Sequence, residues 1–279
     1  MERIVRTSKA IAPLTAALAV AVAGGGCGGS GSGGNAAAKK TPGGASGRAI
    51  VLVQGVYKDK TTEVTGVVFE ARQGLVLTAN HAMENAPNIN VKLSNGTLTH
   101  ARQVARAQCH DMAVLRLFPK PPGLVALPLA RSAGASVGEP VTTLTYVTTS
   151  TSGATQLTRI PGTVSALGVR EAFPPLPATG PFIAHQSRLL PGAAGSPVLD
   201  AQGRMIGLNT LVGHPRSPAL PGVEYALTSD YIARRLGQLR PGVGGALGGW
   251  GAEHNACHAA LHKLIGVGHV HVPNSAGGP

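Results

Sequence analysis

The sequence predicts an all-β protein, and three observations support this class. Glycine (39 residues) and proline (21) are abundant while aromatic residues make up only 3%, which favours tight turns and small side chains. Short β-branched and apolar runs recur along residues 49–227, with turn residues between them. Strands at this spacing are typical of a sandwich or a barrel. The length of 279 residues gives room for one substantial domain.

The predicted strands follow one another from residue 49 onward, and the hairpin dipeptide Asn95-Gly96 separates two of them. The strands are expected at residues 49–57, 63–69, 75–78, 88–92, 98–106, 112–117, 141–147, 163–167, 205–209 and 223–227. One helix is expected after the last strand. Ser229 and Asp230 are suited to cap it, and an apolar stripe continues until Pro241.

The N-terminus is expected to be an export signal. Arg3, Arg6 and Lys9 form a positive region, and residues 11–23 form an apolar run that small residues follow. This run is shorter than the ~20 residues that a membrane-spanning helix needs. One route of processing is cleavage after Ala23, which closes an A-x-A signal.

The other route is lipidation of Cys27. The run Gly24-Gly25-Gly26-Cys27 is similar to a bacterial lipobox, with glycine in place of the large aliphatic residue. Lipidation is favoured slightly over plain secretion, because the Gly/Ser-rich residues 28–47 form a suitable tether. The domain organisation expected is therefore a signal at 1–27, a linker at 28–47, a folded domain at 48–240 and a tail at 241–279.

The formal net charge is +12. A basic balance is typical of proteins that bind nucleic acid or an anionic membrane. Here, however, the Arg and Lys residues are scattered, with no dense run and no interleaved aromatic residues. We therefore expect a solvated basic surface and no nucleic-acid partner.

Three short blocks carry the residue types of serine-protease chemistry. In that chemistry a hydroxyl attacks a carbonyl, an imidazole takes its proton and a buried carboxylate orients the imidazole. The first block delivers His81 after the strand at 75–78, and the second places Asp111 directly before the strand at 112–117. The third is the loop Gly192-Ala193-Ala194-Gly195-Ser196-Pro197, followed by an apolar strand and a hairpin.

In this order the blocks resemble the Deg/HtrA serine proteases of the chymotrypsin type, over about residues 49–239. The resemblance implies two six-stranded β-barrels with a C-terminal helix. It also implies that His81 is the general base, Asp111 the orienting carboxylate and residue 194 the nucleophile position. The N–H groups of Gly192 and Ala194 would then form an oxyanion hole.

The loop departs from the family pattern Gly-x-Ser-Gly-Gly-Pro. Ala194 stands at the nucleophile position, Ala193 replaces an Asn or Asp, and Ser196 replaces the second glycine. Because alanine offers no attacking atom, we expect a pseudoprotease that binds peptides or unfolded segments. The alternative is an active endopeptidase that uses Ser196 or another arrangement. That serine lies two residues downstream in a sharp turn, which argues against reach to the base.

Specificity rests on one candidate residue. Arg188 lies six residues before Ala194, where the trypsin fold often lines the primary pocket. A guanidinium there favours an acidic side chain or a C-terminal carboxylate. An orientation of Arg188 toward solvent is an equally good interpretation.

The tail holds half of the ten histidines. His254, His258 and His262 are spaced by four and would share one face of a helix, where they could bind zinc. The spacing fits no standard zinc finger, so adventitious binding or a disordered tail is favoured. A metal-handling envelope protein is the second alternative function, and no cofactor is expected. Pairing of Cys109 with Cys257 stays open, because spacing alone does not show proximity.

Overall fold

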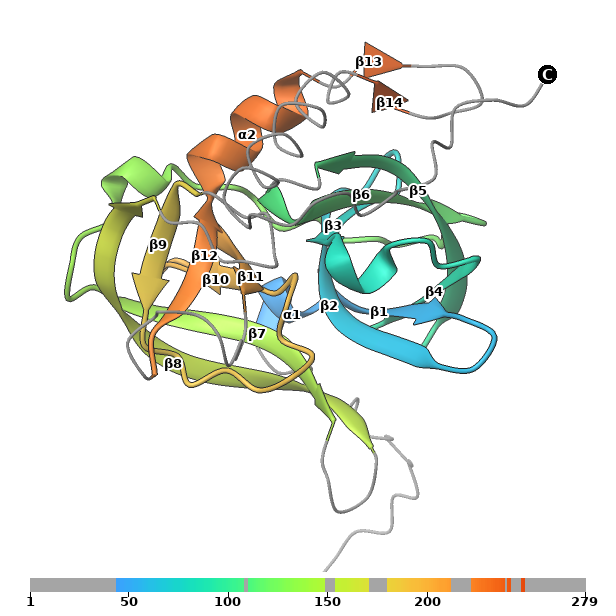
Figure 1. Cartoon of the computed structure of the whole chain (residues 1–279), viewed down its shortest axis with the longest axis horizontal. Coiled ribbons are helices and arrows are strands. Elements are labelled where there is room, and N and C mark those ends of the chain that lie inside the picture. Colours follow the sequence, from blue (N-terminus) through green and yellow to red (C-terminus); the bar gives the residue numbers. More distant parts are fainter. Residues whose placement is uncertain are drawn as a thin grey trace, which may run out of the picture. The chain divides into compact units, whose positions relative to one another are not determined.

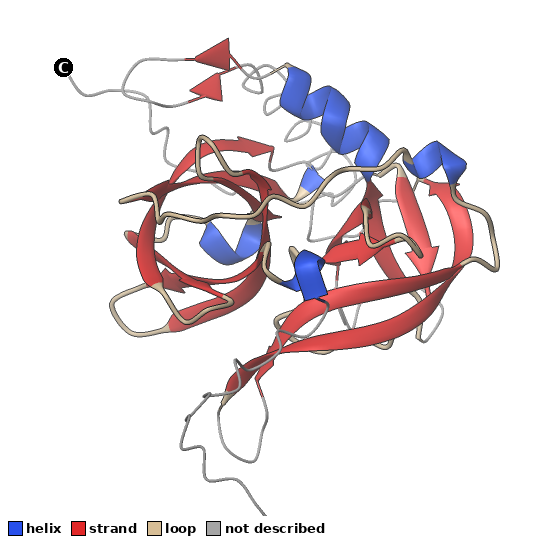
Figure 2. Ribbon diagram, turned by 180° about the vertical axis from the view of Figure 1, so that it is seen from behind, coloured by secondary structure: helices blue, strands red, loops and turns tan. Residues whose placement is uncertain are grey.

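The chain folds into two closed six-stranded β-barrels, with one helix after the second barrel (Figures 1 and 2). The computed structural model describes residues 44–107, 110–148, 154–170, 180–211, 222–238, 240–241 and 247–248. A four-residue helix, α1 (Gly44–Gly47), precedes the first barrel. The short strands β13 (Arg240–Pro241) and β14 (Leu247–Gly248) pair with each other. The expected all-β class and two-barrel architecture are confirmed.

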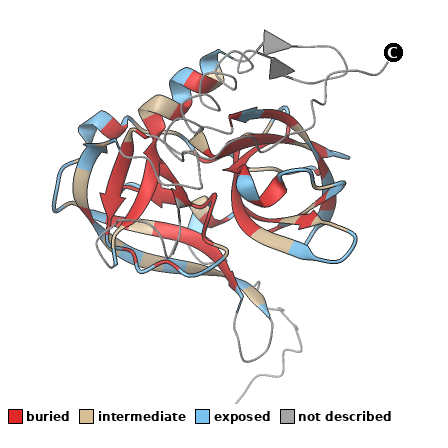
Figure 3. Ribbon diagram, viewed as in Figure 1, coloured by how far each residue is buried: buried red, intermediate tan, exposed pale blue. Residues whose placement is uncertain are grey.

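The first barrel runs in the order β1-β2-β3-β6-β5-β4. Its strands are β1 (Ile50–Val56), β2 (Thr61–Glu70), β3 (Leu75–Ala79), β4 (Asn88–Leu93), β5 (Leu98–Ala107) and β6 (Met112–Phe118). Each lies within two residues of the range that the sequence predicts. A short 3₁₀ helix, η1 (His81–Met83), follows β3. A hydrophobic cluster of side chains such as Val53, Val91 and Leu115 fills the barrel (Figure 3).

The second barrel runs in the order β10-β11-β12-β9-β8-β7. Its strands are β7 (Pro140–Thr148), β8 (Thr155–Val169), β9 (Phe182–His185), β10 (Pro197–Leu199), β11 (Met205–Leu211) and β12 (Glu224–Thr228). The sequence prediction missed β9. All four of its residues are buried, so it shows none of the alternation that identifies a half-exposed strand.

The hairpin between β4 and β5 forms as the Asn95-Gly96 dipeptide predicts. Gly96 adopts a φ of 90°, which glycine reaches without steric cost. The N–H of Thr97 donates to Asn95 Oδ1 at 3.0 Å, and Leu93 N–H donates to the Thr97 carbonyl at 2.8 Å. Strand β4 alternates as expected, with Ile89, Val91 and Leu93 buried.

The helix α2 (Ser229–Gly237) begins where the sequence predicts, but its start is built differently. Thr228 is the N-cap residue, and it makes no side-chain capping bond. Asp230 instead accepts hydrogen bonds at Oδ2 from Ser132 Oγ (3.0 Å) and from the N–H of Ala133 (2.8 Å). The acidic residue therefore ties the helix to the segment that connects the barrels. No helix among the described residues is long and apolar enough to cross a membrane.

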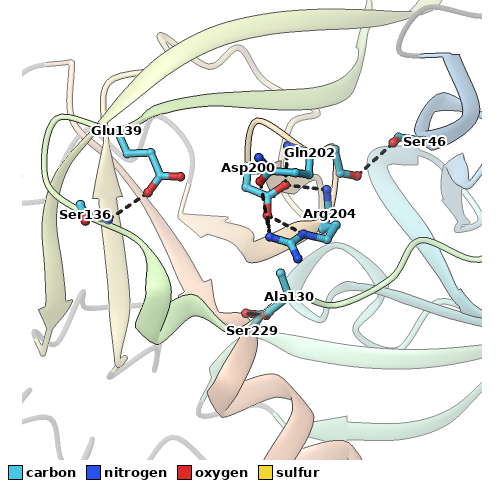
Figure 4. Close-up of polar contacts among 9 residues, drawn as sticks. Ser46, Ala130, Ser136, Glu139, Asp200, Gln202, Arg204 and Ser229 are labelled. Atoms are coloured by element: carbon cyan, nitrogen blue, oxygen red, sulfur yellow. Dashed lines mark hydrogen bonds and ion pairs between the residues drawn. The ribbon is translucent and has the colours of Figure 1, made fainter.

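The turn between β10 and β11 is held by a buried carboxylate (Figure 4). Asp200 Oδ1 accepts the backbone N–H groups of Gln202 (3.0 Å) and Arg204 (2.9 Å), and Oδ2 accepts Arg204 Nε at 2.8 Å. Ser46 Oγ donates to the Gly203 carbonyl at 3.0 Å, which fixes α1 against the same turn. These bonds anchor the far end of the strand that follows the candidate nucleophile loop.

Thr65, on β2, joins the two barrels. Its hydroxyl lies 3.0 Å from Thr145 Oγ1 and accepts the N–H of Tyr146 at 2.9 Å, both on β7. Its own N–H is shared between the carbonyls of Gly192 and Ala194, each at 3.0 Å. The residue is fully buried, so water cannot replace these partners.

Thr65→Val removes this hydroxyl and keeps the shape of the side chain. The Tyr146 N–H then loses a buried acceptor, so we expect the free energy of unfolding to fall by about 1–3 kcal/mol. Urea denaturation measures the change. Thr61→Val is the matched control, because Thr61 is exposed on the same strand and should shift stability by less than about 0.5 kcal/mol. Equal effects of the two substitutions would contradict the role given to Thr65.

Candidate active site

His81 and Asp111 lie beyond the ends of two paired strands. β3 ends at Ala79 and β6 begins at Met112, and these two residues face each other in the ladder. The residues that follow Ala79 and precede Met112 are therefore close in space. His81 Nδ1 lies 2.8 Å from Asp111 Oδ2. The structure thus brings together the two residues that the sequence predicts as base and orienting carboxylate.

The Asp111 carboxylate is 2% exposed, and the contacts at both of its oxygens come from one partner. Oδ1 accepts the backbone N–H of His81 at 2.8 Å, while Oδ2 contacts the imidazole. The Asp111 backbone adopts a φ of 49°, a left-handed conformation that aspartate tolerates better than most residues. Its carbonyl accepts the N–H of Asn80 at 3.1 Å. The two backbone hydrogen bonds, from His81 N–H to the carboxylate and from Asn80 N–H to the Asp111 carbonyl, therefore hold the carboxylate in position beside the imidazole.

The environment of His81 favours its protonated form. Burial lowers the pKa of the imidazole, but the charge of Asp111, its hydrogen bond and the charge of Glu84 together raise it above the ordinary value of 6.5. In the neutral form Nδ1 donates to Asp111, so Nε2 carries the lone pair. The side chain is 36% exposed. The imidazole is thus oriented as a general base requires.

The loop that carries residue 194 docks beside the start of η1. Gly195 has a φ of 77°, and a Cβ there would collide with the Thr65 carbonyl and lie 2.8 Å from the Ala79 nitrogen. Ala194 is buried within the first barrel's hydrophobic cluster, together with Ala79, Ala82 and Met83. The methyl group of residue 194 therefore belongs to the same buried cluster as the residues that flank His81. This placement agrees with the register in which Ala194 occupies the nucleophile position.

The peptide unit between Ala193 and Ala194 is oriented by the Ala193 carbonyl, which points into the core. The carbonyl of Ala193 accepts the Ser196 N–H at 3.1 Å and the Ser196 hydroxyl at 2.5 Å. In a planar trans peptide the N–H of the next residue points the opposite way. The Ala194 N–H therefore points away from Ser196 and the buried interior. An oxyanion hole needs this orientation at one of its two donors.

A buried polar chain continues from Ser196. Asn209 Nδ2 donates to Ser196 Oγ at 3.0 Å, and His185 Nε2 donates to Asn209 Oδ1 at 2.7 Å. Ser187 Oγ lies 2.8 Å from His185 Nδ1 and completes the chain. All four residues are fully buried. The Ser196 hydroxyl is thus committed to two partners, neither of which is His81.

His185 is the member of this buried chain that the sequence did not reveal. It ends a buried apolar strand, where a histidine gives no separate signal. Burial lowers the pKa of His185 to about 4, although the hydrogen bond to Asn209 opposes the shift. The imidazole is therefore neutral at neutral pH, with its proton on Nε2. Asn209 did fall in an expected strand, but its side-chain role was not predicted.

Of the other candidate site residues, the structure describes Arg188 and leaves out the cysteines and the tail histidines. Arg188 is exposed and has a left-handed φ of 35°, and its part in specificity stays a prediction. Cys27, Cys109, Cys257 and the tail histidines His254, His258 and His262 lie outside the described residues. Among the residues that the structure describes, no group of three or more His, Cys, Asp or Glu side chains could hold a metal.

Comparison with known families agrees with this geometry. Residues 64–208, more than half of the chain, match the family described as "Trypsin-like peptidase domain". The chain therefore belongs to the trypsin-like peptidase family. Its relatives place it more narrowly among the Deg/HtrA homologues, as the three sequence blocks predict.

The relatives are exported proteases by name. The periplasmic pH-dependent serine endoprotease DegQ of Escherichia coli (strain K12) is 30% identical over 204 residues, which cover 72% of this chain and 43% of DegQ. The periplasmic serine endoprotease DegP of the same strain is 29% identical over 175 residues, which cover 63% and 35%. This chain therefore matches less than half the length of either relative.

A solved structure gives the same assignment. The HtrA-type protease AlgW, determined with a tripeptide, is 26% identical, and the match covers 68% of this chain and 60% of AlgW. The TM-score is 0.59. The two barrels thus form a fold shared with a protein that is named as an HtrA-type protease.

Asp111→Asn tests the electrostatic origin of the His81 pKa. Asparagine tolerates the left-handed φ, so the backbone is kept while the charge is lost. We expect the pKa of His81 to fall, because the Asp111 charge and hydrogen bond both raise it. NMR titration of the imidazole measures the pKa. Glu84→Gln is the control and should lower it less, since Glu84 is the smallest of the three raising causes. An unchanged pKa in Asp111→Asn would contradict the pairing.

His185→Gln tests the buried polar chain through pH. The folded pKa of about 4 lies below the unfolded value of 6.5, so the unfolded chain binds the extra proton between these values. We therefore expect the free energy of unfolding to fall as pH drops from 6.5 to 4, by about 3 kcal/mol. Urea denaturation across this window should show a flatter curve for His185→Gln. Parallel curves for the wild-type chain and His185→Gln would contradict the buried, neutral imidazole.

Proposed function

We propose that this chain is an exported pseudoprotease that binds peptides or unfolded segments without cleaving them. The observation that supports the proposal is a built but incomplete catalytic site. His81 is held by Asp111 at 2.8 Å, while the loop that should present a hydroxyl presents the methyl group of Ala194. Without a nucleophile, the base has no proton to take from the enzyme.

Peptide binding is favoured over a purely structural role because the loop keeps a defined conformation. The Ala194 N–H is oriented by the buried Ala193 carbonyl. The N–H groups of Gly192 and Ala194 have no hydrogen-bond acceptor among the described residues. The oriented N–H of Ala194, the N–H of Gly192 and the oriented imidazole together suit the carbonyl of a bound peptide. Arg188 is a proposed contact for an acidic or C-terminal group of the ligand.

The alternative, an active endopeptidase that uses Ser196, is opposed by the contacts of that serine. Its hydroxyl is fully buried, donates to the Ala193 carbonyl and accepts from Asn209. A nucleophile must lie within hydrogen-bond reach of its base. Ser196 would have to break both bonds and leave the core to act.

Export and domain organisation are part of the proposal. The N-terminal charge and apolar run, and the periplasmic relatives, support a signal within residues 1–27. We propose that Cys27 is lipidated, that residues 28–47 are a linker whose last four residues form α1, that 48–240 are the peptidase-like domain and that 241–279 are a tail. The lipid would hold the domain at a membrane.

Ala194→Ser tests whether only the nucleophile is missing. We expect the variant to react with a fluorophosphonate probe and to hydrolyse unfolded casein up to about 10⁶-fold faster than wild type, the factor lost when the serine of a Ser-His-Asp triad is removed. The control Ala194→Ser/His81→Ala should neither label nor cleave. Fluorescence anisotropy with labelled casein peptides measures binding to the wild-type chain.

Two outcomes would count against the proposal. Labelling of the wild-type chain that disappears in Ser196→Ala would identify an active enzyme. Absence of peptide binding to the wild-type chain would remove the proposed role, even if Ala194→Ser gained activity.

A further inference from the structure

The first barrel carries a one-sided charge distribution. Between residues 85 and 138 the only acidic residue is Asp111, which is buried against His81. The same span holds six basic residues, namely Lys92, Arg102, Arg106, Arg116, Lys120 and Arg131. Strands β4, β5 and β6 contain no acidic residue at all. These adjacent strands therefore contribute basic side chains and no acidic side chain.

The strand register gathers these side chains on one outward face. Leu98 on β5 faces Lys92 on β4, and His100 faces Phe118 on β6. Arg102 faces Arg116 one step further along. Residues that are paired across strands, or two apart along a strand, lie on the same side of a sheet. Lys92, Leu98, His100, Arg102 and Phe118 thus form one surface, which we call the β4–β6 face.

The β4–β6 face is also unusually apolar for an exposed surface. Leu98 is 70% exposed and Phe118 is 63% exposed, although both project from regular strands. The guanidinium of Arg102 lies 5.4 Å from the centre of the Phe118 ring. Basic side chains set around exposed leucine and phenylalanine are the composition of a surface that lies in a lipid headgroup layer.

The face lies away from the candidate active site. Phe118 ends β6, whereas Asp111 immediately precedes its other end. Seven residues of strand separate them, which is roughly 20 Å at ~3.3 Å per residue. Glu70 on β2 lies opposite Leu75 on β3, which lies opposite Arg116 on β6. The Oε1 atom of Glu70 accepts the Arg72 N–H at 2.9 Å. An object bound to the face would leave His81 accessible.

We propose that the β4–β6 face docks on an anionic lipid membrane. The charge and the exposed apolar side chains fit an anionic headgroup surface, and a lipid membrane is the partner that an exported chain meets everywhere in the envelope. Nucleic acid shares the negative charge, but it is absent from that compartment and does not call for the exposed Leu98 and Phe118. The inference rests on the proposed export of the chain and is independent of peptide binding.

Docking would orient the domain as well as hold it. A lipid on Cys27 would hold only the start of the linker at the membrane, whereas a basic patch with exposed apolar side chains would attach one face of the domain. At physiological salt the attraction extends about 8 Å, so it acts only when the face approaches the headgroups. The membrane would then hold the His81 end of the barrel toward the aqueous space.

The test measures co-sedimentation of the full chain with vesicles. One set contains 30% phosphatidylglycerol in phosphatidylcholine, and the other contains phosphatidylcholine alone. We expect tighter binding to the anionic set, weakening as salt rises. Each basic residue near an anionic surface strengthens binding about fivefold. Lys92→Gln/Arg102→Gln should therefore reduce the preference for anionic vesicles about 25-fold. Leu98→Ser/Phe118→Ser should also reduce binding, and both exposed positions tolerate change.

The matched control is Arg159→Gln/Arg170→Gln, which removes the same charge from exposed positions of the second barrel. This control variant should keep most of the preference for anionic vesicles. The N-terminal apolar run is present in every variant, so it cannot cause a difference between them. Equal losses in the two double variants would reduce the effect to net charge and overturn the proposal. Equal binding to both vesicle sets would overturn it as well. Tighter binding to a DNA duplex than to anionic vesicles, lost in Lys92→Gln/Arg102→Gln, would reassign the face to nucleic acid.

Discussion

One buried residue, Thr65, is hydrogen-bonded to the second barrel, to the loop that carries Ala194 and to the strand that precedes His81. Its hydroxyl and N–H reach β7 of the second barrel and the carbonyls of Gly192 and Ala194. Its own carbonyl accepts the hydroxyl of Thr78, two residues before Asn80 and the His81 turn. The relative position of base and loop therefore depends on hydrogen bonds in a water-free joint, where each lost partner is costly. Apolar packing between the barrels buries surface without a preferred direction, whereas the directional hydrogen bonds of Thr65 fix how the two barrels are positioned relative to each other.

The loop that carries Ala194 is also held by a buried hydrogen-bond chain, which could not be predicted from its sequence. Where the family pattern has a glycine, Ser196 bonds the Ala193 carbonyl and extends through Asn209 to His185. Since the Ala193 carbonyl and the Ala194 N–H belong to one planar peptide, holding the first orients the second. The substitution that looked like a candidate nucleophile is thus better explained as an anchor. Loss of the hydroxyl at position 194 leaves this anchoring intact.

Much of the fold could be predicted because its signals are local. The Asn95-Gly96 turn, the alternating β4 and the residues flanking His81 and Asp111 each reflect short-range chemistry. Long-range partners could not be predicted. Asp230 looks like a helix cap but bonds Ser132 and Ala133, almost a hundred residues away. Strand β9 is buried on both faces, which erases the periodicity that identifies a strand.

Two histidines show how environment decides what an imidazole can do. His185 has neutral partners and a dry surrounding, so its pKa falls to about 4 and it acts as a fixed structural donor. His81 faces a buried carboxylate, so its pKa rises. When neutral, Nε2 of His81 can accept a ligand N–H; when protonated, it donates and favours a carboxylate. Under the proposed function, with no serine at position 194 to deprotonate, the same orientation would make His81 a pH-dependent contact for a bound peptide rather than a base.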